Sequence, residues 1–358
     1  MRIFVFGSSI TSSYWNGAAT YYRGIYRQIS RLGHQVTFAE PDAFNRQQKT
    51  DQGDFSYVRS IVYKNEDELD SLLRSACDHD LVIKHSGVGV FDELLEERVL
   101  HCRTGMTRVA FWDVDAPATL ARVEKNHEDP FWLHIPEYDF VFTYGGGPAV
   151  VDHYLRLGAA HCIPIYNALD PDIHHPVASD PEVECDLLFV GNRLPDREQR
   201  VHDFFFRAAE LAPDLRFILG GEGWAGKAMP ENVRWIGHVG THDLNRLNSS
   251  ARMVLNINRE SMAGVGFSPP TRVFEAAGAG ACLITDKWKG IEEFFVPGRE
   301  ILIAANAADV VRHLNEITPA RAHEIGENMR RKAVHEHTYQ LRAEQLVEVL
   351  TDWRAVAA

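Results

Sequence analysis

Short apolar runs alternate with longer amphipathic segments along the whole of this 358-residue chain. The first apolar run, residues 2–6, ends at Gly7, and a segment with helical spacing follows at 17–32. Such runs are typical of strands buried on both faces of a sheet, and parallel strands need a helical crossover between them. The alternation therefore predicts an α/β protein built from βαβ units.

The same pattern places the other expected elements. In the first half we expect strands at 34–39, 80–84, 107–112 and 138–143, and helices at 66–77 and 91–103. In the second half we expect strands at 187–190, 216–219, 233–236, 253–257, 282–285 and 300–303. Helices are expected there at 197–211, 242–250, 271–279, 290–295 and 306–316, followed by two long helices over 319–353.

The length of the chain favours two domains, because one hydrophobic core rarely grows beyond roughly 250–300 residues. Between about 164 and 185 the sequence is rich in Pro and Asp and shows no period, which is typical of a linker. We therefore expect Rossmann-like domains at 1–168 and 169–338, with a C-terminal helix at 339–358. Ligands of such open sheets bind outside the carboxyl ends of the strands, so we expect a central cleft there.

Composition narrows the class of partner. The formal net charge of -13 disfavours nonspecific binding to nucleic acid or anionic lipid, which needs clustered Lys and Arg. No apolar run approaches the ~18–20 residues of a transmembrane helix, and the N-terminus lacks the order of a signal peptide. We therefore expect a cytoplasmic protein without a transmembrane segment.

The cysteines point to the same compartment. Five cysteines are scattered along the chain without a CxxC pair, at positions 77, 102, 162, 185 and 282. An odd and dispersed set argues against a disulfide framework and against a zinc site, so a reducing compartment is expected. The seventeen histidines lack metal-site spacing, and we expect no metal.

The most informative stretch runs from Asn256 to Asp286 and reads as strand, glycine-rich loop, helix and strand. Pro270 suits the first turn of the helix. The amides of the next three residues, Thr271 to Val273, would then be free to bind a diphosphate.

Two side chains of this helix extend the argument. Arg272 would add a charge-assisted hydrogen bond to the diphosphate. Glu275, one turn further along, would accept two hydrogen bonds from a ribose diol. The alternative is that Glu275 only compensates Arg272 on a solvated helix face and that the glycines serve packing.

This stretch resembles the donor-binding segment of glycosyltransferases with the GT-B fold, and more narrowly the CgeB-like spore-maturation group of the family-1 type. The resemblance extends from Gly191 to about Arg342. It is strengthened by the segments 189–197, 233–239 and 337–342.

The resemblance implies a role for each matching residue. Glu275 would hold the ribose, and Arg193 or Arg197 would neutralise the leaving phosphate. His238 and Val239 would contact the base. The remaining donor-site positions would be Gly191, Asn192, Ser268, Pro269, Thr271 and Arg272.

The function implied is transfer of a sugar from a nucleotide-sugar, UDP-linked, to an acceptor hydroxyl of unknown identity. The domain 1–168 would be the acceptor side, and the domain 169–338 would bind the nucleotide-sugar donor. The C-terminal helices would cross back to the first domain, and the reaction would be retaining, metal-independent and without a cofactor. Many retaining members carry a second Glu eight residues before the ribose Glu, but Phe267 stands there. A nucleotide-sugar epimerase of the same fold and a non-catalytic nucleotide-sugar-binding protein remain alternatives.

Two loops of the first domain follow expected strands. The loop 7–17 lacks GxGxxG spacing, which disfavours a dinucleotide site. Its Tyr14 and Trp15 would border the sugar or the acceptor, or else pack on the domain. His85 would contact the transferred sugar, or else be a satisfied loop histidine.

Asp113 and Asp115 follow the strand at 107–112. The pair would bind a divalent cation, or supply a general base to the acceptor, or cap the next helix. In an extended segment the two side chains point to opposite faces, which weakens the shared-metal interpretation.

Overall fold

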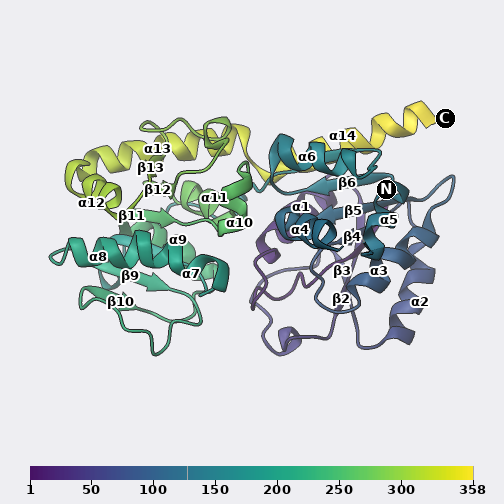
Figure 1. Cartoon of the computed structure of the whole chain (residues 1–358), viewed down its shortest axis with the longest axis horizontal. Helices are drawn as coiled ribbons and strands as arrows, with labels where there is room; N and C mark the ends of the chain where they lie inside the picture. Colours follow the sequence, from purple (N-terminus) through teal and green to yellow (C-terminus); the bar gives the residue numbers. More distant parts are fainter. Residues whose placement is uncertain (127, 358) are drawn as a thin grey trace. The chain divides into compact units, whose positions relative to one another are not determined.

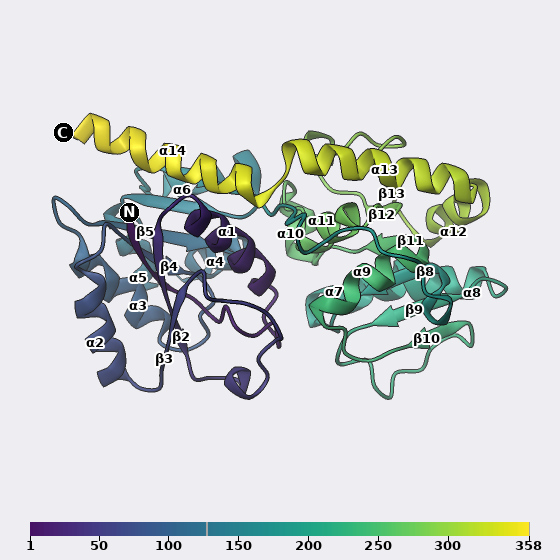
Figure 2. The same ribbon diagram turned by 180° about the vertical axis from the view of Figure 1, so that it is seen from behind.

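The computed structural model describes residues 1–126 and 128–357, with side chains up to residue 351, and the chain divides into two compact units. Unit 1 combines Met1–Asn167 with the C-terminal helix α14 (Tyr339–Ala357), and unit 2 spans Ala168–Thr338 (Figure 1). Helix α14 packs along α1 (Ala19–Arg31), as both views show (Figures 1 and 2). The chain therefore ends on the unit in which it began.

Unit 1 is built on a parallel sheet. Over the described residues this sheet has seven strands in the order β3-β2-β1-β4-β5-β6-β7. The strands are β1 (Arg2–Phe6), β2 (Gln35–Pro41), β3 (Arg59–Tyr63), β4 (Leu81–His85), β5 (Arg108–Asp113), β6 (Phe140–Thr143) and β7 (Cys162–Pro164). Its remaining α-helices are α2 (Glu66–Ala76), α3 (Asp92–Arg98), α4 (Ala116–Lys125), α5 (Pro130–His134) and α6 (Gly147–Arg156).

Unit 2 repeats this plan with a second parallel sheet. Within residues 168–338, all of them described, six strands follow the order β10-β9-β8-β11-β12-β13. They are β8 (Cys185–Val190), β9 (Phe217–Gly220), β10 (Val233–Trp235), β11 (Ala251–Asn256), β12 (Leu283–Asp286) and β13 (Leu302–Ala304). The helices are α7 (Pro195–Val201), α8 (Arg207–Leu211), α9 (Thr241–Ser250), α10 (Glu260–Val265), α11 (Thr271–Gly278), α12 (Ala307–Glu316) and α13 (Pro319–Glu336).

The strand orders confirm the expected Rossmann-like α/β class. In each sheet the chain first builds outward in one direction and then crosses to the other side, between β1 and β4 in unit 1 and between β8 and β11 in unit 2. In open α/β sheets the loops that leave such neighbouring strands diverge, and ligands bind outside their carboxyl ends. These strand ends are therefore the first place to look for a ligand in each unit.

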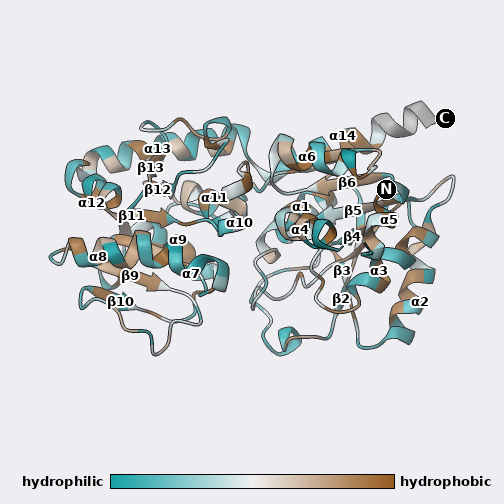
Figure 3. Ribbon diagram, in the orientation of Figure 1, coloured by the Kyte–Doolittle hydropathy of each residue, from teal (hydrophilic) through white to brown (hydrophobic). Residues whose placement is uncertain are grey.

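Burial explains why the apolar runs form strands. All five side chains of β4 are buried, as are the last four of β1 and of β11. Hydrophobic colour gathers in the strands of both sheets, and the surrounding helices show teal on one side (Figure 3). None of the helices formed by the described residues has the length and hydrophobicity that a bilayer span requires.

Several expected elements differ from the structure. The expected helix at 290–295 is only a short 3-10 turn, Ile291–Glu293. The division between the units, after Asn167, lies within the segment expected to be a linker. Most of that segment belongs to unit 2, where Asp180 accepts a hydrogen bond from Arg246 at 2.7 Å and His174 is buried. The break between the two long helices falls at His337, where it was expected.

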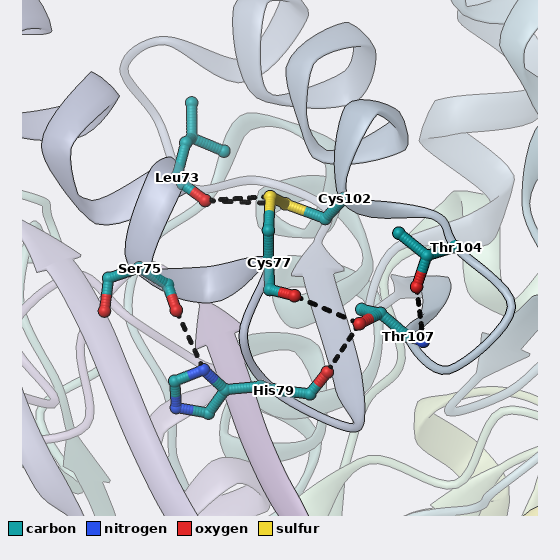
Figure 4. The surroundings of a disulfide bond; sticks show 7 residues. All are labelled: Leu73, Ser75, Cys77, His79, Cys102, Thr104 and Thr107. Carbon is teal, nitrogen blue, oxygen red and sulfur yellow. Dashed lines mark hydrogen bonds between the residues drawn. A yellow bond between two sulfur atoms is a disulfide. The ribbon is translucent and has the colours of Figure 1, made fainter.

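The cysteine expectation needs correction. A disulfide joins Cys77, at the end of α2, to Cys102, and the two sulfurs lie 3.2 and 3.4 Å from the carbonyl oxygen of Leu73 (Figure 4). Cysteines 25 residues apart in sequence meet because α2 and the turn at Val99–Cys102 pack together. Spacing along the chain carries no sign of this approach. The other three cysteines are free thiols and are buried.

Candidate functional site

Three loops at the carboxyl edge of the unit 2 sheet are joined through their backbones. The amide of Gly191, after β8, donates to the carbonyl of Gly220 at 2.8 Å, and the amide of Gly221 donates to that of Gly237 at 2.7 Å. Val239 packs against Gly220, so this expected base-contacting residue lies at the end of β9. These bonds fix the loops after β8, β9 and β10 as one surface.

Arg272 spans the point where the strand order reverses. From helix α11 its Nε donates to the carbonyl of Val190, the last residue of β8, at 2.6 Å. One terminal nitrogen donates to Oδ1 of Asn256, the last residue of β11, at 2.9 Å. A cation is thereby held between the ends of the two strands that flank the switch point.

Arg197 brings a second cation to the same place. Its terminal nitrogen donates to the carbonyl of Asn192 at 2.5 Å. Its guanidinium carbon lies 5.7 Å from the ring centre of Phe189, and that of Arg272 lies 5.2 Å from the same centre. A methyl group on Gly191 would come within 2.9 Å of the Arg197 guanidinium and 3.0 Å of the Arg272 guanidinium. Glycine at this position therefore makes room for both.

Burial destabilises the charge of both guanidiniums. Burial, and then the neighbouring charge of Arg272, lower the pKa of Arg197 to about 9. Burial likewise lowers the pKa of Arg272, and Glu275 and Asp286 oppose that shift. Two desolvated cations without a full set of carboxylates form a site for an anion, because a bound anion would stabilise both charges.

The start of α11 supplies the amides of this site, with one correction. Pro270 stands at the N-cap rather than in the first turn, and the amide of Val273 donates to its carbonyl at 3.0 Å. The amide of Val273 is therefore not available to a ligand, whereas those of Thr271 and Arg272 precede the first helical hydrogen bond. Before the helix, buried Ser268 donates from its hydroxyl to the carbonyl of Gly266 at 2.9 Å, beside Pro269.

Glu275 does not lie on a solvated face. The residue is only 8% exposed, on the buried side of α11. Over the described residues no hydrogen bond or ion pair reaches its carboxylate, although the charges of Arg272 and His174 lie near enough to interact with it. The alternative of a surface compensation for Arg272 is therefore wrong. A buried carboxylate with uncommitted oxygens is suited to accept hydrogen bonds from a ligand.

Arg193 has a different environment from Arg197. Its Nε donates to Glu198 at 2.8 Å, and this hydrogen bond raises the pKa of Arg193. Lys227 donates to the same carboxylate at 2.9 Å, and the two cations lower the pKa of Glu198 to about 2. Arg193 is thus held at the rim of the surface by an ion pair. Its place beside the leaving phosphate stays a prediction, as does the contact of His238 with a base.

His85 lies in the core of unit 1. The last residue of β4 is fully buried, its Nε2 lies 2.5 Å from the hydroxyl of Tyr26, and its ring packs on Trp112. Burial holds the pKa of His85 well below its usual value. The predicted contact with a transferred sugar is therefore not available at this position, and the alternative of a structural histidine fits better.

Asp113 ends β5 as a buried hydrogen-bond centre. Its carboxylate accepts from Ser86 at 2.7 Å, from Tyr154 at 2.5 Å and from Thr119 at 3.0 Å. Burial raises the pKa of Asp113 in spite of these bonds. The carboxylate is thus committed to the protein, which argues against the predicted role as a general base. Asp115 stands at the N-cap of α4 without a side-chain capping bond.

Sequence reasoning missed some buried polar residues near the carboxyl ends of the unit 2 strands. Asp286, the last residue of β12, is fully buried, pairs with Arg200 at 2.6 Å and accepts from the amide of Asn258 at 3.1 Å. An aspartate that directly follows an apolar run was the available signal. None of the described residues forms a group of His, Cys, Asp or Glu side chains suited to hold a metal ion.

The fold is that of known GT-B proteins. The structure resembles Anabaena HepE solved with UDP and glucose, at a TM-score of 0.70 and 13% identity, over 98% of this chain and 100% of that one. It resembles sucrose-phosphate synthase from Thermosynechococcus elongatus at a TM-score of 0.71 and 14% identity, over 99% of this chain and 100% of that one. It also resembles an α-glucosyltransferase in complex with UDP, at a TM-score of 0.72 and 13% identity, over 98% of this chain and 100% of that one. The chain therefore has the GT-B fold, with two Rossmann-like sheets.

Sequence comparison gives a narrower match. Residues 197–348 match the model of the glycosyl transferase-like family. This range includes most of unit 2, with Arg197, Arg272 and Glu275, and continues into α14. No match was found among curated proteins.

Proposed function

We propose that this protein is a glycosyltransferase that moves a sugar from a UDP-linked donor to an acceptor hydroxyl. The observation that carries the proposal is the cation pair at the unit 2 switch point, Arg197 and Arg272 against Gly191, with the uncommitted carboxylate of Glu275 on the same helix as Arg272. A diphosphate needs positive charge and amide donors, and a ribose diol needs a carboxylate acceptor.

The comparisons support the choice of nucleotide. HepE and the α-glucosyltransferase were both solved with UDP, and the glycosyl transferase-like match covers the proposed diphosphate and ribose residues. In this proposal the diphosphate lies against Arg197 and the amides of Thr271 and Arg272. The ribose hydroxyls donate to Glu275, and the base lies by the loop of His238 and Val239.

The proposed chemistry follows from where the charge develops. The bond between the anomeric carbon and the diphosphate oxygen breaks, and the acceptor oxygen forms the new bond to that carbon. The proton of the acceptor hydroxyl leaves with UDP. The guanidiniums of Arg197, Arg272 and Arg193 stabilise the negative charge of the departing diphosphate.

Finer features extend the proposal. We propose a hexosyltransferase of the CgeB-like group with a retaining course. The arginines, rather than a metal, would neutralise the leaving group, and no cofactor would be needed. The cytoplasmic location also stays a prediction.

A thermal-shift panel followed by product analysis tests this function. UDP and UDP-sugars should raise the melting temperature, because a ligand that binds only the folded state stabilises it. The Glu275→Ala variant should lose about tenfold or more in UDP affinity, since a hydrogen bond to a charged group is worth about 1.5–3 kcal/mol. Unchanged affinity by calorimetry would contradict the ribose role of Glu275.

Product analysis separates the alternatives. A transferase releases UDP with a new glycoside, and an epimerase of the same fold releases UDP and a free or rearranged sugar without any acceptor. A binding protein shows affinity for the donor but no turnover, and Arg197→Ala would then change affinity alone.

A further inference from the structure

Three aromatic residues in the carboxyl-edge loops of unit 1 adopt the left-handed backbone region. They are Trp15 after β1 (φ 48°), Phe44 after β2 (φ 57°) and Phe91 after β4 (φ 58°). This conformation is unfavourable for bulky residues and is concentrated at ligand sites. Trp15 is 46% exposed and Phe44 is 52% exposed, so their strained backbones present large rings to solvent.

The loops that carry Trp15 and Phe44 are tied together. The hydroxyl of Ser12 donates to the carbonyl of Lys49 at 2.5 Å, and that of Ser13 donates to Asp51 at 3.0 Å. The ring of Phe44 lies against Gly89, in the loop after β4, where a methyl group would come within 2.6 Å of it. The two aromatic residues therefore belong to one braced edge of the sheet.

Arg46 links the two aromatic residues directly. Its guanidinium donates to the carbonyl of Trp15 at 3.4 Å and lies 4.9 Å from the ring centre of Phe44. The residue is only 7% exposed, and among the described residues its Nε has no hydrogen-bond partner. A buried donor without an acceptor is costly, and a hydroxyl of a ligand would satisfy it.

The charges around these rings argue for a neutral ligand. Arg23 is paired with Asp51 at 2.7 Å, and the ammonium of Lys49 lies 3.7 Å from the ring centre of Tyr14. Arg23 and Lys49 thus already have partners within the protein, and the whole chain carries a net charge of -13. A nucleic-acid strand would need uncommitted positive charge along its backbone, so this surface favours an uncharged polyol over a nucleic acid.

We propose that Trp15, Phe44 and Arg46 form a saccharide-binding subsite on unit 1. The apolar C–H face of a sugar ring packs on the aromatic rings, and a sugar hydroxyl accepts a hydrogen bond from the Nε of Arg46. With the proposed function, on which this assignment as an acceptor site rests, the acceptor is a carbohydrate.

Saturation-transfer difference NMR on the full chain tests the subsite. The probes are methyl α-glucoside, methyl α-mannoside, N-acetylglucosamine, cellobiose and maltose. Saturation transferred to ring C–H protons is expected for at least one of them. In Trp15→Asn and Phe44→Asn its affinity should fall by about threefold to tenfold, from the size of aromatic contact energies. Asparagine tolerates the left-handed backbone, so both variants should fold.

The matched control is Leu133→Asn, another exposed apolar residue of unit 1, which should leave the signal unchanged. The proposal is overturned if no probe gives a signal, or if the signal survives in both aromatic variants. It is also overturned if none of the sugars binds and a 13-nucleotide single-stranded DNA binds in a manner that depends on Trp15 and Phe44. Calorimetry with UDP on the same preparations reports separately on the donor site. Absence of UDP binding would contradict the proposed function, whether or not the sugars bind.

Discussion

Replacing Gly191 by alanine tests the cation pair without removing any charge. The added methyl group would lie 2.9 Å from the Arg197 guanidinium and 3.0 Å from both the Arg272 guanidinium and the Phe189 ring. Such distances force the side chains to move, because they are shorter than ordinary contacts to carbon. Loss of one charge-assisted hydrogen bond to the diphosphate costs about 1.5–3 kcal/mol, which is roughly a ten- to hundredfold rise in the Kd for UDP.

Titration calorimetry with UDP on wild type, Gly191→Ala and Gly264→Ala measures this effect. Gly264 is the control, because a methyl group there meets nothing within 4 Å. Melting temperatures show whether the crowding also costs the about 1–3 kcal/mol of stability typical of overpacking. In the Arg197→Ala background, Gly191→Ala should lower the affinity for UDP by less than it does in the wild type, because the Arg197 guanidinium that the methyl group displaces is absent. A Gly191→Ala variant that binds UDP as the wild type does would contradict the role of Arg197 and Arg272 in binding the diphosphate.

Three further predictions follow from other parts of the molecule. Burial lowers the pKa of Arg197 to about 9 and a bound diphosphate would raise it, so affinity for UDP should be full below pH 9 and fall as pH rises through that value. A calorimetric pH series on Arg197→Gln should lack this fall in affinity. The same dependence of affinity on pH in the variant and the wild type would argue against the role of Arg197. Under denaturing conditions a thiol titration should find three reactive cysteines rather than five. Cys77→Ser should lower the free energy of unfolding by about 3–4 kcal/mol, because the disulfide closes a loop of 25 residues. Five thiols in the oxidised protein would disprove the bond. His85→Phe should keep UDP affinity and lose about 1 kcal/mol of stability with the hydrogen bond to Tyr26, as measured by urea unfolding, and a large loss of affinity would point to an active-site role.

The sequence predicted the fold well because apolar runs and glycine loops are local signals. The strands from β8 to β13 lie where the runs 187–190 to 300–303 were expected, and the break at His337 was found too. The division between the units, after Asn167, lies inside the segment 164–185 that was expected to be a linker. Pro and Asp composition does not reveal how the rest of that segment packs, such as buried His174 against α11.

The candidate site was predictable only in part. Arg272 and Glu275 share one helix, so their proximity follows from helical spacing. The approach of Arg197 to Gly191 depends on how the loop after β8 folds back, and the ending of β5 in a buried Asp113 depends on partners such as Ser86 and Tyr154. These contacts join residues distant in sequence, and no local pattern encodes them.

A crystal structure of the protein with UDP is the decisive test of the proposed donor site. The ribose hydroxyls should lie within hydrogen-bonding distance of the Glu275 carboxylate, and the diphosphate should lie against the guanidiniums of Arg197 and Arg272. A nucleotide bound elsewhere, or bound to these arginines with its ribose away from Glu275, would contradict the proposed site.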